Sequence, residues 1–434
     1  MDSPKRTIRW VVDHRLCTGC GTCVAACPAG AIAMRETPAG LPRPAIDDGP
    51  CTHCGICYDV CSGVRYSMDL PRDVDGLFMP PTREVFLGRS TDPTMHTLGQ
   101  SGGVATAMLT YMMRQNRISH ALVTRMPKDG SLRPQAFFAS RPEELLECMG
   151  SKYCLNPLNA ALPGWPGGGA KVAMVGLGCH VHGIRNLQRL LPRRWADAFQ
   201  LVIGLFCLQS SGYLGIDHLL RLRGEGKPVS RIIYRKKTAP GDRGHPCIEY
   251  SDGTFADLPE DFLWEFFNDK FAPLRCRFCF DQMNRSADLA LGDTNGFPPE
   301  VSAKGLNVIA VYTQRGQDLL QQARRDGAIE LFDCDRQVMW KGQVLLSDRK
   351  PRILSAYARW KQLGRPVPHV PVLEDLPARP QRLSTKVILR FLWKIEAVGD
   401  RSRAYRKLVR FVTLMKRLAR FKSWLCTLRR GGGK

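Results

Sequence analysis

The sequence lacks two features that mark membrane-spanning and exported proteins. No run approaches the roughly eighteen consecutive apolar residues that a spanning helix needs, and the strongly apolar stretch at residues 201–208 is far too short. The first ten residues include Asp2, Lys5, Arg6 and Arg9, so they lack the apolar core of a secretory signal. We therefore expect a cytoplasmic protein without a membrane-spanning helix.

Acidic residues are few relative to basic ones. The chain has 63 Lys and Arg against 40 Asp and Glu, a net charge of +23. Residues 381–434 contain 16 basic and 2 acidic residues, so they supply +14 of that charge. The basic excess is therefore mostly a property of the C-terminal tail.

Cysteine, in contrast, is abundant, with 17 residues. In a long chain without an export signal, this number favours metal ligation or redox chemistry over disulfides. The spacing C-x2-C-x2-C-x3-C occurs twice, as in bacterial ferredoxins with two [4Fe–4S] clusters, where the fourth cysteine of each copy binds the other cluster. The predicted ligand sets are Cys17, Cys20, Cys23 and Cys61 for one cluster, and Cys51, Cys54, Cys57 and Cys27 for the other.

A zinc site is the alternative interpretation of these repeats. Four-cysteine zinc sites also use C-x2-C pairs, but a third cysteine at the same step is surplus for zinc. The second repeat has Ser62 where the first has Pro28, which we expect to alter a turn without removing a ligand. Gly19, Gly21 and Gly55 suit loops that bring backbone N–H groups close to sulfur.

Composition divides the chain into four parts. We predict an α+β ferredoxin-like head at residues 1–70, an α/β body at 86–364, a Pro-rich linker at 365–382 and a basic helical tail at 383–434. Short apolar runs predict strands, and amphipathic stretches predict helices. The predicted strands are 121–124, 172–176, 201–206, 231–234 and 308–312, and the predicted helices are 104–115, 142–149, 184–191 and 317–325.

Five motifs in the body together resemble one family. They are QSGGVATAMLTYM (100–112), GSKYCLNPLN (150–159), KVAMVGLGCHVHGIRNL (171–187), GLFC (204–207) and CRFCFDQMNRSADLALGD (276–293). In this order they resemble the family of coenzyme F420 hydrogenase/dehydrogenase beta subunits. The resemblance spans about residues 100–295 and implies that the body binds FAD.

The resemblance also implies which residues lie near the flavin. The SGG loop precedes a predicted helix whose free N–H groups and dipole favour an anion or an electron-rich flavin edge, although a plain helix cap is the alternative. A lysine near the flavin N1 side would stabilise the reduced anion, while an ordinary surface loop is again the alternative. The predicted cofactor-binding residues are Ser101, Gly102, Gly103, Ser151, Lys152, Tyr153, Asn156, Asn159 and Asp293. Asp293 is included because it follows the strand-like run 289–291, where functional side chains are common in open α/β sheets, and the start of a turn is the alternative for it.

In the family, cysteines at four of these motif positions bind a further [4Fe–4S] cluster. The resemblance thus implies a third cluster on Cys179, Cys207, Cys276 and Cys279. The alternative is that Cys179 and Cys207 are small buried hydrophobic residues. We assign no catalytic residue: His180 stands where the family usually has glutamine. The other cysteines, which have no partner spacing, are Cys148, Cys154, Cys247, Cys334 and Cys426.

The tail has an apolar stripe at helical spacing on a strongly basic background. Residues 401–434 contain 12 basic residues and no acid. Such a helix suits peripheral contact with the inner face of a membrane, docking on a partner or on the body, or nucleic-acid binding. Nucleic acid is the weakest of these because the body contains no groove-reading module.

The expected function is an iron–sulfur flavoprotein oxidoreductase. FAD would exchange two electrons with F420 or a small organic substrate, and the [4Fe–4S] clusters would exchange single electrons with an external carrier or partner redox subunit. The alternatives are an electron-transfer subunit without its own organic substrate and a structural or regulatory cluster protein.

Overall fold

The computed structural model describes residues 5–66, 68–223, 226–258, 271–294, 296–343, 348–374, 389–390 and 393–394. The predicted basic tail lies outside the described residues apart from the last two pairs. Within these ranges, no helix is both long enough and apolar enough to cross a membrane.

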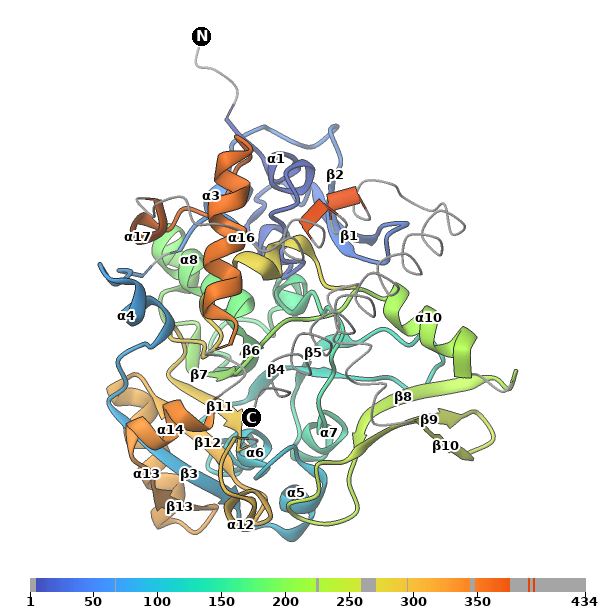
Figure 1. The fold of residues 1–434 in the computed structure, drawn as a ribbon, viewed down its shortest axis with the longest axis vertical. Coiled ribbons are helices and arrows are strands. Elements are labelled where there is room, and N and C mark those ends of the chain that lie inside the picture. The colour runs from blue at the N-terminus through green and yellow to red at the C-terminus, as the bar shows by residue number, and fades with distance from the viewer. Residues whose placement is uncertain are drawn as a thin grey trace, which may run out of the picture.

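The body is built on one eight-stranded mixed sheet in the order β13-β3-β12-β11-β7-β6-β4-β5 (Figure 1). Its four middle strands, β11, β7, β6 and β4, run parallel to one another, whereas both edges are antiparallel. The strands are β3 (Glu84–Ser90), β4 (His120–Arg125), β5 (Gln135–Ala139), β6 (Val172–Leu177), β7 (Phe199–Leu205), β11 (Leu289–Asp293), β12 (Asn307–Val311) and β13 (Ile329–Asp333). The predicted α/β body is confirmed as a mixed sheet with covering helices.

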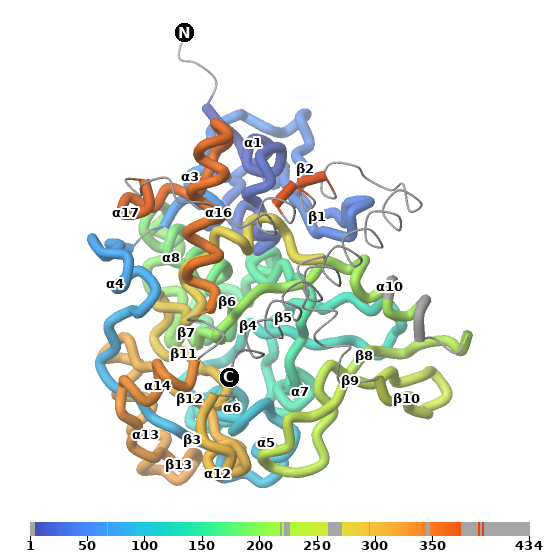
Figure 2. Tube along the Cα trace, in the orientation of Figure 1, coloured from blue at the N-terminus to red at the C-terminus, as the bar shows by residue number. Residues whose placement is uncertain are grey.

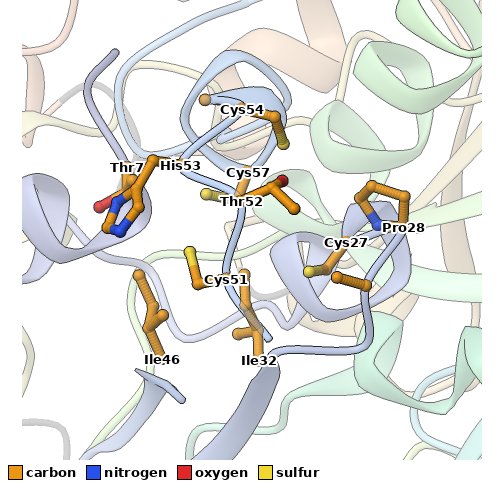
Figure 3. Close-up of a pocket in the computed structure, with 12 residues that line it drawn as sticks. Thr7, Cys27, Pro28, Ile32, Ile46, Cys51, Thr52, His53, Cys54 and Cys57 are labelled. Carbon is orange, nitrogen blue, oxygen red and sulfur yellow. The ribbon is translucent and has the colours of Figure 1, made fainter. Parts of the chain in front are cut away.

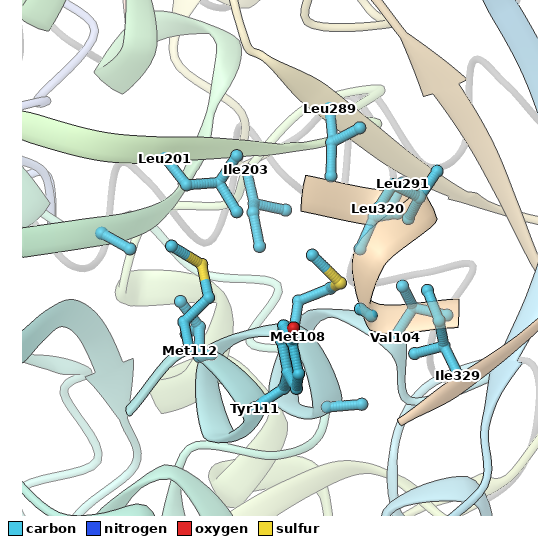
Figure 4. Close-up of a cluster of buried hydrophobic side chains, with 14 of the residues drawn as sticks. Val104, Met108, Tyr111, Met112, Leu201, Ile203, Leu289, Leu291, Leu320 and Ile329 are labelled. Atoms are coloured by element: carbon cyan, nitrogen blue, oxygen red, sulfur yellow. The ribbon is translucent and has the colours of Figure 1, made fainter. Parts of the chain in front are cut away.

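Side-chain alternation along the strands gives the sheet two buried faces. On β7, Leu201 and Ile203 lie in a core with Met108 and Met112 of the covering helix α6 (Figure 4). Val202, between them, lies in a second core beneath α8. Fully burying such a side chain contributes roughly 1.5–3 kcal/mol, so this period-two pattern strongly selects the register.

Helices and one small antiparallel sheet complete the body. All four predicted helices form, and α8 begins six residues earlier than predicted. The helices are α5 (Pro93–Leu98), α6 (Val104–Arg114), α7 (Pro142–Glu147), the 3-10 helix η1 (Leu158–Gly164), α8 (Gly178–Leu190), α9 (Pro192–Trp195), α10 (Leu214–Arg223), the 3-10 helix η2 (Leu274–Phe278), α12 (Pro299–Ser302), α13 (Gln314–Arg325), α14 (Arg336–Gly342) and α16 (Lys350–Gln362). The small sheet is β8 (Val229–Lys236), β9 (His245–Tyr250) and β10 (Phe255–Asp257).

The head packs directly on the body and on helix α16 (Figures 1 and 2). Its buried residues Ile8, Val11 and Leu16 share one hydrophobic core with Tyr357 and Trp360 of α16. The short helix α17 (Pro371–Glu374) forms inside the predicted linker and adds Leu373 to that core. The head elements are α1 (Ile8–Asp13), α2 (Thr22–Ala26), β1 (Ile32–Glu36), β2 (Pro42–Ile46) and α3 (Ile56–Asp59), and α4 (Val74–Phe78) follows.

Head and body approach closely at Gly21, which has a φ of +85°. A Cβ added there would lie 2.5 Å from the backbone nitrogen of Ala160, whereas Gly30, with a φ of +63°, has nothing within 4 Å of such a Cβ. We expect Gly21→Ala to lower the free energy of unfolding by about 1–3 kcal/mol more than Gly30→Ala, because only the first substitution adds a backbone clash to the φ strain. Urea unfolding of both variants measures the difference, and equal losses would contradict the tight contact.

Candidate cluster and cofactor site

The parallel strands bring predicted ligands to one edge of the sheet. Cys179 follows β6 at the start of α8, Cys207 lies two residues beyond β7, and Asp293 ends β11. Because β6, β7 and β11 are parallel neighbours, their carboxyl ends lie side by side. This edge is where ligand sites form in open α/β sheets.

A loop carrying the C-x2-C pair is held over the same edge. Cys276 lies on η2 and Cys279 follows it. The backbone N–H of Cys207 donates to the Gln282 carbonyl at 2.9 Å, and the Asn284 amide donates to the Gly176 carbonyl at 2.9 Å. These bonds fix the loop against β6 and β7, and so place its cysteines near Cys207.

The four cysteines of the predicted third cluster share one electrostatic environment. Burial raises the pKa of Cys179, and nearby Cys20, Cys207, Cys276 and Cys279 raise it further. The four body thiols therefore converge, and a head cysteine, Cys20, adjoins them. As thiolates they would repel one another, which bound iron would relieve.

In the head, influences on the thiol pKa values support the predicted exchange of the fourth cysteines between the two repeats. Burial raises the pKa of Cys61, and Cys20 and Cys17 from the other repeat raise it further. Burial also raises the pKa of Cys57, and Cys54 and Cys27, the latter from the first repeat, raise it further. The thiols therefore group as the spacing predicts, although iron binding by these residues stays a prediction.

Backbone donors point at these sulfurs. N–H groups of Gly19, Ile8 and Gly63 approach the sulfurs of Cys17, Cys57 and Cys61, each at 3.3 Å. Such donors stabilise the negative charge of ligating thiolates. Ser62, which replaces the usual proline, places its hydroxyl 3.5 Å from the Cys20 sulfur, so it faces one cluster site.

The four cysteines predicted to bind the second head cluster line a pocket (Figure 3). About 340 Å³ of space lies between the protein atoms, part of it open to solvent. Thr52 and His53 on its rim are exposed, whereas Cys17, Cys20, Cys23 and Cys61 are buried. Among the described residues, no three Cys, His, Asp or Glu side chains meet the geometry for a single metal ion. The pocket cysteines are Cys27, Cys51, Cys54 and Cys57.

Three predicted flavin residues converge near the third group. Ser101 Oγ donates to Asp293 Oδ1, and Arg235 Nη1 donates to Asp293 Oδ2 at 2.8 Å. Arg235 also lies 3.5 Å from the Tyr153 hydroxyl, and its side chain is only 9% exposed. The sequence analysis missed Arg235, because a basic residue on β8 carries no motif.

The SGG loop does not offer the free helix donors that we expected. The N–H groups of Gly102 and Val104 donate to Asn307 Oδ1 at 3.0 and 3.2 Å, and Gly103 N–H donates to the Gln100 carbonyl. A Cβ at Gly103 would lie 2.2 Å from the Met95 carbonyl oxygen. The two glycines therefore serve close packing, and only Ser101 of this motif points into the Asp293 group.

Lys152 forms a compact cap in the second motif. Its Nζ donates to the carbonyls of Cys148, Met149 and Gly150, the last at 2.9 Å, and burial lowers its pKa to about 8. Ser151 and Tyr153 flank it in the sequence. Their contact with a flavin stays a prediction.

The two asparagines of this motif bind protein groups. Asn156 donates to Thr124 at the end of β4, while Asn159 donates to Thr22 Oγ1 and to the His180 carbonyl, both at 2.9 Å. Asn159 thus lies where head and body meet. Asn156 Oδ1 and Gln100 Oε1 are buried acceptors with no hydrogen-bond partner in the described part of the chain, so a flavin donor would fit either.

His180 has a local structural role. Its Nδ1 accepts from the Leu177 N–H at 3.0 Å, and its Nε2 donates to the Asn156 carbonyl at 2.8 Å. Burial lowers the pKa of His180 to about 4, so the ring is neutral near pH 7. It therefore joins the start of α8 to the motif that contains Asn156.

We expect His180→Gln to reduce the acid sensitivity of the fold. The unfolded state binds more protons than the native state between pH 6.5 and 4, so the native protein loses stability as pH falls through this window. From pH 7 to 5 the histidine contributes a loss of about 2 kcal/mol, which glutamine, able to make both hydrogen bonds, would avoid. Parallel denaturant titrations of both proteins measure it, and identical pH dependence would exclude a buried neutral His180.

The cysteine groups and the head fold define an iron–sulfur protein of the ferredoxin type: the family model described as a 4Fe-4S dicluster domain matches residues 16–62. The chain belongs to the family of coenzyme F420 hydrogenase/dehydrogenase beta subunits. The N-terminal model of that family matches residues 85–163, and its C-terminal model matches residues 169–337.

Similar proteins are oxidoreductases or their subunits. The chain is 25% identical to the coenzyme F420-dependent sulfite reductase of Methanocaldococcus jannaschii over 75% of this chain and 49% of that protein. It is 24% identical to the coenzyme F420 hydrogenase subunit beta of Methanothermobacter thermautotrophicus, over 66% of this chain and 98% of that subunit. It is 23% identical to the 7-hydroxymethyl chlorophyll a reductase of Oryza sativa, over 57% and 51%. The chain thus spans about half the length of the first and third relatives.

A solved structure shows the same fold. A chain of the F420-reducing [NiFe] hydrogenase complex from Methanosarcina barkeri superposes with a TM-score of 0.53 at 22% identity, over 68% of this chain and 98% of that one. At this identity the likeness concerns the fold alone.

Proposed function

We propose that this protein is an FAD-dependent iron–sulfur oxidoreductase that connects a two-electron reaction in the body to one-electron transfer through three [4Fe–4S] clusters. The observation that carries the proposal is that head Cys20 lies close enough to Cys179 to raise its pKa, as do Cys207, Cys276 and Cys279 of the body. It supports a continuous series of cluster sites from the head to the carboxyl edge of the sheet. FAD, when bound, supplies the conversion between electron pairs and single electrons.

The order of the sites follows from burial. The pocket with exposed Thr52 and His53 on its rim is the outer site, and the buried group around Cys20 is the inner one. Thr22 Oγ1 lies 3.1 Å from the Cys20 sulfur and accepts from the Asn159 amide, so the inner site is held against the body. An external one-electron carrier would meet the head at the outer pocket.

At the other end, the Asp293 group would position the flavin. Arg235 and Ser101 hold the Asp293 carboxylate, and Tyr153 places its hydroxyl beside Arg235. A rigid, charge-paired group of this kind can orient a cofactor with little reorganisation. F420 or a small organic substrate would react there.

The alternative is an electron-transfer subunit without its own organic substrate. Two relatives favour it, one named as the beta subunit of coenzyme F420 hydrogenase and the other as a subunit of F420H2 dehydrogenase, since both names describe parts of larger complexes. The two functions differ in whether reduced F420 or a small substrate alone can reduce the bound flavin.

We expect the protein, purified without oxygen, to contain FAD and about twelve iron atoms, four for each cluster. Cys179→Ser should retain FAD and lose about four iron atoms. Cys154→Ser is the matched control, because Cys154 is a buried thiol of the body outside the three groups. Iron and flavin assays decide: about eight iron atoms in the unsubstituted protein would exclude the third cluster, and zinc without flavin would exclude the whole proposal.

We expect Arg235→Gln to weaken FAD binding by at least about tenfold, because the Asp293 carboxylate loses a charged hydrogen bond worth roughly 1.5–3 kcal/mol. Arg185→Gln is the control, since Arg185 pairs with Asp288 next to the opposite end of β11. Flavin titration measures binding, and single-turnover bleaching of the flavin by reduced F420 tests the substrate. Equal FAD affinities in the two variants would show that the Asp293 group is not part of the flavin site.

A further inference from the structure

Arg275 is a buried cation between the head and the third cysteine group. It lies on η2, next to Cys276, and only 3% of its surface is exposed. Its Nε donates to the Gly63 carbonyl at 2.7 Å, and its Nη2 donates to the Ser62 carbonyl at 3.3 Å and to the Tyr66 hydroxyl. One side chain of the body therefore binds the head segment that follows Cys61.

In the part of the chain that the structure describes, no carboxylate pairs with this charge. Among the described residues, none lies within 4.0 Å of the Arg275 guanidinium. The nearby Asp281 is engaged elsewhere, with His182 at 2.8 Å and with Arg285 at 3.7 Å. Carbonyl and hydroxyl groups satisfy the donors of Arg275 but do not balance its charge. A buried unpaired charge costs several kcal/mol, so a stable fold needs another anion nearby.

Predicted cluster ligands, which become negative as thiolates, lie on both sides of Arg275. The positive charge of Arg275 lowers the pKa of Cys61 on the head side, against a larger increase from burial. On the body side, burial raises the pKa of Cys279 to about 11, and Arg275 is the leading opposing influence. Arg275 adjoins Cys276 in the chain and binds the carbonyls of Ser62 and Gly63, the two residues after Cys61, so it lies between a predicted ligand of the third cluster and one of the inner head cluster.

We infer that Arg275 is the shared counter-charge of the inner head cluster and the third cluster, and that it raises the reduction potentials of both. The inference rests on the proposed function. A cubane held by four thiolates carries a net negative charge that grows when it accepts an electron, so a fixed buried cation stabilises the reduced form. Arg275 is thus a positioning and electrostatic residue for electron transfer across the junction of head and body.

Arginine suits this position better than lysine. Its planar guanidinium presents several donors in fixed directions, which lets it bind both head carbonyls and Tyr66 at once while keeping its charge at any accessible pH. The same contacts that hold the head in place therefore hold the charge between the two sites.

The test is an EPR-monitored redox titration of the cluster-loaded protein and of Arg275→Gln. In Arg275→Gln, we expect the ratio of oxidised to reduced protein at a given potential to rise at least tenfold for each of the two flanking clusters. This corresponds to a reduction potential lower by about 59 mV for a one-electron couple. The outer cluster, on Cys27, Cys51, Cys54 and Cys57, should keep its potential and serves as the internal reference. The same titration of Cys179→Ser, which is expected to lack the third cluster, shows which EPR signals belong to the two head clusters.

Two further variants separate charge from packing. Arg275→Lys keeps the charge and should stay within a few-fold of the unsubstituted protein in the same ratio. Arg133→Gln removes a cation that bridges head and body through Glu36 at 2.9 Å, and should leave all potentials unchanged because a carboxylate already balances it. If Arg275→Gln fails to assemble the flanking clusters but Arg275→Lys assembles them, the need for charge is supported.

Unchanged potentials in a fully loaded Arg275→Gln protein would overturn the inference, as would failure of Arg275→Lys to assemble the clusters. These outcomes differ from a failure of the proposed function. In that case the unsubstituted protein would itself lack the third cluster or the flavin, as shown by its iron and flavin content.

Discussion

The close contact of the head with the carboxyl edge of the parallel strands is the constraint on which the site depends. Gly21 has no room for a side chain against Ala160, and Gly183 of α8 has none against Thr22. Asn159 then joins Thr22 to the His180 carbonyl. Because these contacts permit so little separation, Cys20 lies close enough to raise the pKa of Cys179, and the head adjoins the cysteine group of the body.

Local patterns were sufficient to predict much of this arrangement. The repeated cysteine spacing predicted the exchange of Cys27 and Cys61 between repeats. This assignment stays a prediction, which the influence of Cys27 on the pKa of Cys57 and of Cys20 on the pKa of Cys61 supports. Short apolar runs identified the strands that end near Cys179 and Cys207. Strand β3 was not predicted, although it pairs with both β12 and β13, because it follows residues 71–81, whose prolines indicate a joint between head and body.

The residues that sequence reasoning missed act through long-range contacts. Arg235 reaches Asp293 from β8, Arg275 reaches Ser62 across more than two hundred residues, and Asn307 occupies the donors at the start of α6. A single arginine or asparagine carries no local signal for such a role. Two of the donors expected at the SGG loop are occupied for this reason: the sequence shows a helix start but not the Asn307 side chain that accepts from Gly102 and Val104.

The two buried arginines indicate how charge is distributed along the proposed path. Arg235 is paired with Asp293, so that end of the path is close to neutral before any cofactor binds. Within the described residues, the hydrogen-bond acceptors of Arg275 are uncharged and thiols lie near it, so its charge is not balanced by a paired carboxylate before anionic groups form there. A low-dielectric interior magnifies this difference. The charge distribution therefore favours strongly negative groups between head and body and a group of lower charge near Asp293. Clusters followed by a flavin ring would require this order.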